Sequence, residues 1–146
     1  MAAKILIVDD EPDMLVLLKM MIETRPGLEV VVTNSPLEVG EILDREKVDV
    51  VITDLKMPGV DGLEVLSEVK KHDEQIVVMV ITAYGSLESA EQALAKGAFD
   101  FISKPFRKEQ IMMAVDKALR WRDMVRQNQR LQEQLKAGKA EDKARG

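Results

Sequence analysis

The sequence predicts an α/β fold in which helices cover both faces of a parallel β-sheet. Short runs rich in Val and Ile alternate five times with helix-like stretches, a pattern typical of βαβ units. Several of these runs are apolar at consecutive positions, as in strands that are buried on both faces. Three of them lead directly to Asp9, Asp54 and Thr82. Because ligands of open parallel sheets lie beyond the carboxyl ends of the strands, we expect these side chains to gather at one edge.

The first half of the chain is expected to supply strands at residues 4–8, 28–33 and 48–53. A helix begins at Pro12, a residue that suits the first helical turn, and ends before Pro26 and Gly27. Its apolar face is predicted to consist of Met14, Leu17, Leu18, Met21 and Ile22. Asn34 or Ser35 can cap a second helix. That helix is expected to bury Val39, Ile42 and Leu43.

The second half is expected to supply strands at residues 76–81 and 99–103. After the Asp54 loop, Asp61 or Gly62 opens a third helix that runs through Lys71, with Leu63, Leu66 and Val69 inward. Ser86 can cap a fourth helix, whose thin apolar face predicts that it is weakly held. That face is formed by Leu87, Ala90 and Leu94. A long last helix begins near Lys108.

The strand patterns also predict the order of the sheet. Residues 4–8 are apolar on both faces and read as a central strand, whereas residues 28–33 carry Glu29 and fit an edge. Right-handed crossovers then require helices on both faces. The flavodoxin-like order 2-1-3-4-5 satisfies these conditions and has its switch point between the first and third strands. Asp9, Asp10 and Asp54 would meet at that point.

Composition excludes several classes of function. The 146 residues carry a net charge of −5 and a pI of about 5.0, which argues against direct nucleic-acid binding by this segment. There is no Cys and only one His, so disulfides, thiolate sites and multi-histidine zinc sites are excluded. No apolar run approaches the roughly 18 residues of a membrane span. We therefore expect one cytoplasmic domain with no membrane association.

The acidic residues indicate a particular chemistry. Three carboxylates at one sheet edge are costly without a cation, and oxygen ligands alone favour Mg²⁺. An ionised Asp beside Mg²⁺ can attack a phosphoryl group, and Thr82 and Lys104 could supply donors to its oxygens. The alternative is that each Asp caps the following helix. That reading suits a single Asp better than three acids with a Thr and a Lys at four converging strand ends.

Four motifs carry a family resemblance: IVDDEP at 7–12, DLKMPGVDG at 54–62, TAYG at 82–85 and GAFDFISKPF at 97–106. In this order and spacing they resemble the receiver domain of bacterial two-component response regulators, from residue 4 to about 120. The resemblance implies that Asp54 is the phosphoacceptor. It further implies a Mg²⁺ ion bound by Asp10, Asp54 and the backbone carbonyl of Lys56, with Asp9 acting mainly through a metal-bound water.

The resemblance also implies a switch rather than an enzyme. Thr82 and Lys104 would contact the phosphoryl group, Phe101 would turn inward on activation, and the Lys104–Pro105 bond would be cis. The phosphodonor would be a sensor histidine kinase, and the signal would leave through the fourth helix, fifth strand and fifth helix. Tyr84 could shield the acyl phosphate from water, or it could be an exposed loop aromatic without a kinetic role.

Residues 82–106 are most similar to receivers of NtrC-like transcriptional activators, which carry an ATPase and a DNA-binding domain downstream. Other output classes and a stand-alone phosphorelay protein stay open. An Asp-nucleophile phosphatase is less favoured, because Lys56 stands where a second acid would be expected and no cap insertion follows. A flavodoxin-like cofactor binder would need a phosphate-binding loop where the acidic residues 9–11 stand.

The C-terminal stretch predicts a homodimer. We expect a receiver at 1–120, a helical linker at 121–136 and a flexible tail at 137–146. Positions spaced alternately by three and four form the seam of a short parallel coiled coil: Trp121, Met124, Asn128, Leu131 and Leu135. Asn128 at an a-type position would fix register and two-strandedness. The alternative is a solvated single helix that frays beyond Leu119.

Overall fold

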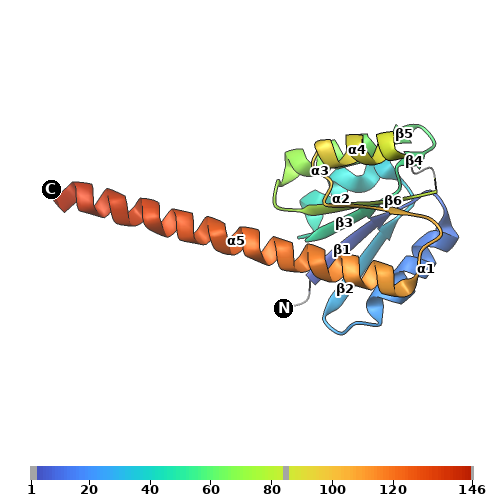
Figure 1. Cartoon of the computed structure of the whole chain (residues 1–146), viewed down its shortest axis with the longest axis horizontal. Helices are drawn as coiled ribbons and strands as arrows, with labels where there is room; N and C mark the ends of the chain where they lie inside the picture. The colour runs from blue at the N-terminus through green and yellow to red at the C-terminus, as the bar shows by residue number, and fades with distance from the viewer. Residues whose placement is uncertain (1–2, 84–85, 146) are drawn as a thin grey trace.

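The computed structural model describes residues 3–83 and 86–145. A central parallel sheet lies between two layers of helices, and one long helix projects from the body (Figure 1). The strands are β1 (Ala3–Val8), β2 (Leu28–Thr33), β3 (Val50–Thr53), β4 (Lys56–Met57), β5 (Val60–Asp61), β6 (Val77–Thr82) and β7 (Asp100–Ser103). The helices are α1 (Pro12–Glu23), the 3₁₀ turn η1 (Pro36–Glu38), α2 (Val39–Arg45), α3 (Gly62–His72), α4 (Leu87–Ala95) and α5 (Lys108–Arg145).

The main sheet has the order β2-β1-β3-β6-β7, and all its neighbouring strands are parallel. This is the predicted flavodoxin-like order, since β6 and β7 are the fourth and fifth strands of the sheet along the chain. The remaining strands, β4 and β5, form a small antiparallel hairpin after Asp54. The order brings the carboxyl ends of β1 and β3 together, which positions the functional site.

Two hydrophobic clusters hold the layers together, one on each face of the sheet. Helices α2, α3 and α4 cover one face, and α1 and the first turns of α5 cover the other (Figure 1). Strands β1, β3 and β6 contribute to both clusters through alternate residues, such as Leu6 to one and Ile5 to the other. Their interiors are fully buried, whereas β2 at the edge is only partly covered. The central strands are therefore rigid supports for the residues at their ends.

Two helices turn different faces inward than the sequence predicts. In α1, Leu15, Leu18 and Ile22 are buried, and the predicted core residue Leu17 is 43% exposed. Leu15, Leu18 and Ile22 are spaced by three and four residues and so lie on one side of the helix, and Leu17 lies beside this side rather than on it.

Helix α4 is held even more weakly than predicted. Its only buried residue is Ala93, while Leu87 is 77% exposed and Leu94 49% exposed. The small Ala93 side chain is therefore the part of α4 that packs inward, and both leucines lie on its outer side. Little apolar area therefore opposes a shift of this helix.

The helix caps agree with the sequence at two of three places. Asp61 accepts a hydrogen bond from Leu63 N at the start of α3, and Ser86 accepts one from Ser89 N at the start of α4. The predicted cap by Asn34 or Ser35 is wrong. Thr33 takes over, because its Oγ1 accepts from Ser35 N and donates to Glu38 Oε2, which shapes the η1 turn before α2.

Helix α5 continues through Arg145, so the helix includes the region 137–145 that the sequence predicts as a flexible tail. The stretch has one Gly and no Pro, and its Ala, Lys, Glu and Arg residues are strong helix formers. Extending an existing helix costs far less than starting a new one. Across residues 3–83 and 86–145, no helix is both long and apolar enough to span a membrane.

Candidate functional site

The site forms where four parallel strands end side by side. Val8 pairs with Thr53, so Asp9 and Asp54, the residues that follow them, are neighbours. Asp54 N donates to the carbonyl oxygen of Val8 at 3.1 Å, which fixes the Asp54 backbone against β1. On the other side, Lys104 follows β7, and its N–H donates to the carbonyl oxygen of Thr82 at 2.9 Å. The sheet itself therefore sets the spacing of the predicted site residues.

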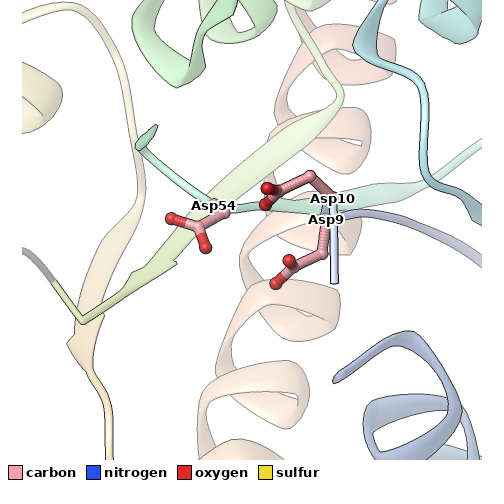
Figure 2. A group of neighbouring side chains, drawn as sticks. All are labelled: Asp9, Asp10 and Asp54. Atoms are coloured by element: carbon pink, nitrogen blue, oxygen red, sulfur yellow. The ribbon is translucent and has the colours of Figure 1, made fainter. Parts of the chain in front are cut away.

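Three carboxylates lie together at this edge. One oxygen from each of Asp9, Asp10 and Asp54 lies within 4.8 Å of the others (Figure 2). Asp9 and Asp54 are buried, at 2% and 6% exposure, and Asp10 is half-buried. Burial in a low-dielectric surrounding strengthens the mutual repulsion of these groups, so the cluster calls for positive charge.

Lys104 supplies one positive charge. Its Nζ lies 2.9 Å from Asp54 Oδ2 and 3.2 Å from Asp9 Oδ2, and its side chain is 11% exposed. Backbone donors satisfy the other two oxygens: Glu11 N donates to Asp9 Oδ1 at 2.9 Å, and Lys56 N to Asp54 Oδ1 at 3.2 Å. The orientation of both carboxylates is therefore held from two sides.

Burial and neighbouring charges shift the pKa values of Asp9 and Lys104. Burial raises the pKa of Asp9, and the Glu11 N–H and Lys104 only partly oppose this effect. For Lys104, burial alone would lower the pKa, but the hydrogen bond to Asp54 and the charges of Asp9 and Asp54 outweigh it, so the pKa is raised. Lys104 thus stays charged, and Asp9 holds a proton more readily than a solvent-exposed Asp does.

The donor set fits a hard divalent cation. Three carboxylates and one ammonium leave two negative charges if all four groups are ionised, and the candidate ligands are all oxygens. Mg²⁺ is bound in proteins by one or two carboxylates with water and phosphate oxygens, so the cluster suits this ion. Asp9, Asp10 and Asp54 are the residues that would hold it.

The other predicted residues surround the cluster. Thr82 is fully buried at the end of β6. Phe101 lies on β7 opposite Val80 and packs half-buried against the cluster beneath α2, α3 and α4. The Lys104–Pro105 peptide bond is cis. The proposed shielding residue, Tyr84, lies outside the described residues.

The structure adds Gly62, which sequence reasoning treats only as a possible helix start. A Cβ at this position would lie 2.2 Å from the carbonyl oxygen of Asp54 and 2.6 Å from Leu55 Cα. Gly62 N also donates to the carbonyl oxygen of Leu55 at 2.6 Å. The start of α3 therefore lies directly against the Asp54 loop. A Gly at the first position of a helix, close after an Asp, is the signal that could have indicated this approach.

The predicted dimer seam lies apart from the acidic cluster, on the projecting part of α5. Met124, Leu131 and Leu135 are 50–66% exposed. Trp121 differs, because its ring stacks at a tilt on Phe99 of the same chain, with the ring centroids 6.0 Å apart. Trp121 thus joins the helix to the body as well as lying on the seam.

Comparisons with known proteins point to one family. The model of the response regulator receiver domain matches residues 5–116. The transcriptional regulatory protein GlrR of Escherichia coli K12 is 38% identical over 132 residues, which cover 84% of this chain and 30% of GlrR. The sporulation initiation phosphotransferase F of Bacillus subtilis is 37% identical over 119 residues, which cover 82% of this chain and 95% of that protein.

Solved structures agree with the family model. The beryllofluoride-activated NtrC4 receiver domain dimer has a TM-score of 0.77 and 28% identity to this chain, and covers 82% of this chain and 98% of that one. The first curated relatives are much longer, so the chain spans less than a third of their length.

Proposed function

The chain belongs to the response regulator receiver domain family, and we propose that it is a phosphorylation-dependent switch with Asp54 as its phosphoacceptor. The observation that carries the proposal is the environment of Asp54. Its carboxylate lies at the carboxyl edge of the sheet, in contact with the Lys104 ammonium and close to the carboxylates of Asp9 and Asp10. A sensor histidine kinase is the phosphodonor.

Each side chain around Asp54 has a separate role in the transfer of the phosphoryl group. An Asp54 oxygen attacks the phosphorus, the bond from phosphorus to the donor histidine nitrogen breaks, and the nitrogen keeps the electron pair. Lys56 N and Lys104 hold the carboxylate in one orientation, which lowers the entropic cost of reaching the attack geometry. The Lys104 ammonium then turns from the carboxylate to an oxygen of the phosphoryl group, and the Thr82 hydroxyl donates to another.

Mg²⁺ bound by Asp9, Asp10, Asp54 and the Lys56 carbonyl would offset the negative charge of carboxylates and phosphoryl oxygens. Asp9 would contribute to this site mainly through a water. Asp9, Asp10 and Asp54 would take these roles without any movement of the sheet, because β1 and β3 already hold them together.

A variant of the acceptor tests the assignment. The full chain is incubated with Mg²⁺ and acetyl phosphate, and intact mass reports the number of phosphoryl groups. We expect one group on the parent and on Asp44→Asn, a control with an exposed carboxylate, and none on Asp54→Asn. Stoichiometric labelling of Asp54→Asn would show that another residue is the acceptor.

We propose that the signal leaves through α4, β7 and α5. When Thr82 moves toward the phosphoryl group, Phe101 fills the space behind it, a two-state packing change. The small buried area of α4 supports this route, because Ala93 alone is buried in that helix. Hydrogen exchange with and without beryllofluoride should change in α4 and β7. Changes confined to α1 and α2 would refute the route.

We further propose that the output is transcriptional, through an ATPase and a DNA-binding domain on the same polypeptide. The relatives named as transcriptional regulators support this class of output. A stand-alone phosphorelay protein is the second candidate, because this chain covers 95% of the sporulation phosphotransferase. The sequence of the gene downstream of residue 146 distinguishes the two. A cytoplasmic location stays a prediction.

The helix α5 seam forms a homodimer in this proposal. The exposed side chains of Met124, Leu131 and Leu135 support it, as does the relative described as a receiver domain dimer. Sedimentation of the full chain should show a dimer, and a version ending at Arg120 should be monomeric. The seam is excluded if the truncated chain dimerises equally well, or if the full chain stays monomeric at high micromolar concentration.

A further inference from the structure

A second charge cluster lies at the opposite edge of the sheet from Asp54, at the residue that precedes β3. Asp49 is buried and makes two hydrogen bonds to the start of β1. Its backbone N–H donates to the Lys4 carbonyl oxygen, and its side-chain Oδ2 accepts from Lys4 N, both at 2.8 Å. Its other carboxylate oxygen, Oδ1, contacts Nη1 of Arg122 and lies 3.2 Å from Nη2 of Arg126. Both arginines belong to α5.

This cluster occurs where α5 leaves the body of the molecule beside the start of β1 (Figure 1). The side chains of Asp49, Arg122 and Arg126 are 8%, 15% and 25% exposed. Exposed ion pairs hold little free energy, but this carboxylate is shielded, and removal of both arginines would leave a buried charge unpaired. The cluster is therefore strong enough to orient the helix.

We propose that Asp49 is a positioning residue that sets the rotational orientation of the α5 extension relative to the receiver. With 3.6 residues per turn, the directions of Met124, Leu131 and Leu135 average roughly 180° from those of Arg122 and Arg126. Asp49 thus turns Met124, Leu131 and Leu135 of the seam away from the body. One consequence is that a second copy of the chain can reach the seam without meeting the receiver. Only this consequence rests on the proposed function, because it requires the proposed dimer.

Trp121 holds the helix from a second direction. It precedes Arg122 by roughly 100° around the helix and packs on Phe99, just before β7. The extension is therefore fixed at two points on adjacent sides. Without the Asp49 contacts, the ion pairs that oppose rotation are lost, and the helix can rotate, bend or fray about the Trp121 contact.

The distance between the receiver and the extension tests this proposal inside one chain. Because the protein has no Cys, the pair Lys71→Cys and Glu133→Cys gives two unique spin-label sites, one on α3 and one on α5. Dilution with unlabelled protein leaves only the distance within a chain. We expect a narrow distance distribution in the otherwise unchanged chain.

Two variants then remove the ion pairs of Asp49 with Arg122 and Arg126 in different ways, and both are called clamp variants below. Arg122→Gln with Arg126→Gln removes the cations, and Asp49→Asn removes the charge but keeps an oxygen for Lys4 N. Each should broaden the distribution about twofold and speed amide exchange at residues 120–127 about tenfold. Arg122→Lys with Arg126→Lys should restore only part of the order, because Lys lacks the planar fork of Arg. Lys117→Gln with Arg120→Gln, the same charge change on exposed positions of α5, should behave like the parent.

The possible results test the role of Asp49 separately from the proposed dimer. An unchanged distribution in both clamp variants, at an unchanged urea unfolding midpoint, overturns the role of Asp49. The same result in the Lys117 and Arg120 control as in the clamp variants also overturns it, because net charge would then be the cause. Phosphorylation of Asp54, at the far end of β3, should be unchanged in the clamp variants. If the parent chain is found to be monomeric, the proposed dimer is excluded, but the distance measurement within one chain still tests the role of Asp49.

Discussion

A methyl group at Gly62 should disturb the Asp54 loop. The added Cβ would lie 2.2 Å from the Asp54 carbonyl oxygen, and ordinary contact begins at 3.4 Å, so α3 and the loop must separate by roughly 1 Å. The loop cannot retreat freely, because Leu55 and Met57 are buried, at 4% and 7% exposure. Overpacking costs about 1–3 kcal/mol and the Ala gains up to about 1 kcal/mol in helix propensity, so Gly62→Ala should lose about 1–2 kcal/mol.

Urea unfolding measures the loss of stability, and the rate of labelling by acetyl phosphate measures the displacement of Asp54. Labelling should slow, because the shift also disturbs the bond from Lys56 N to Asp54 Oδ1. Gly40→Ala is the matched control. Its Cβ would meet only the carboxyl group of Glu68, the far end of a flexible side chain, so stability should stay equal or rise.

The result that refutes this reasoning is a Gly62→Ala protein with parental stability and a parental labelling rate. Such a result would mean that α3 moves away from the loop at no cost. A loss of equal size in Gly40→Ala would also refute it, since the effect would then not depend on contact with the Asp54 backbone.

Three further predictions concern charge and backbone. Lys104→Met should cost about 1–3 kcal/mol in urea unfolding without Mg²⁺, because Asp9 and Asp54 lose their counter-charge, and the deficit should shrink when Mg²⁺ is added. Burial raises the pKa of Asp9 above its ordinary value of 3.8. Over an interval above pH 3.8, the folded protein therefore keeps a proton on Asp9 that the unfolded chain has lost. The free energy of unfolding falls as pH rises through that interval. Asp9→Asn should therefore raise the metal-free free energy of unfolding at pH 7 by more than about 0.5 kcal/mol and flatten its pH dependence; an unchanged pH profile would contradict this. Gly97 has a φ of +106°, so Gly97→Ala should lose about 1–2 kcal/mol in the same assay, and Gly138→Ala, whose Cβ meets open space, should lose nothing.

The sequence by itself determined the sheet order and the site at its edge. Short runs of consecutive β-branched residues such as Val50, Val51 and Ile52 favour a strand covered on both faces, and right-handed crossovers leave few ways to order such strands. Once β1 and β3 are paired in parallel with Val8 beside Thr53, Asp9 and Asp54 meet, because each directly follows its strand. The acidic cluster follows from that register, and Lys104 joins it because it directly follows β7, which pairs with β6.

Only the tertiary structure decided the contacts that depend on the distance between whole elements. The inward faces of α1 and α4 differ from prediction. The spacing of apolar residues indicates only a broad side of each helix, and packing against the sheet decides which residues on that side are buried. The approach of Gly62 to Asp54 depends on how closely α3 packs. Asp49 and Arg126 are 77 residues apart, and no local pattern marks either one. Short-range periodicity reports which surfaces are apolar, whereas long-range ion pairs require the folded arrangement to bring their charges together.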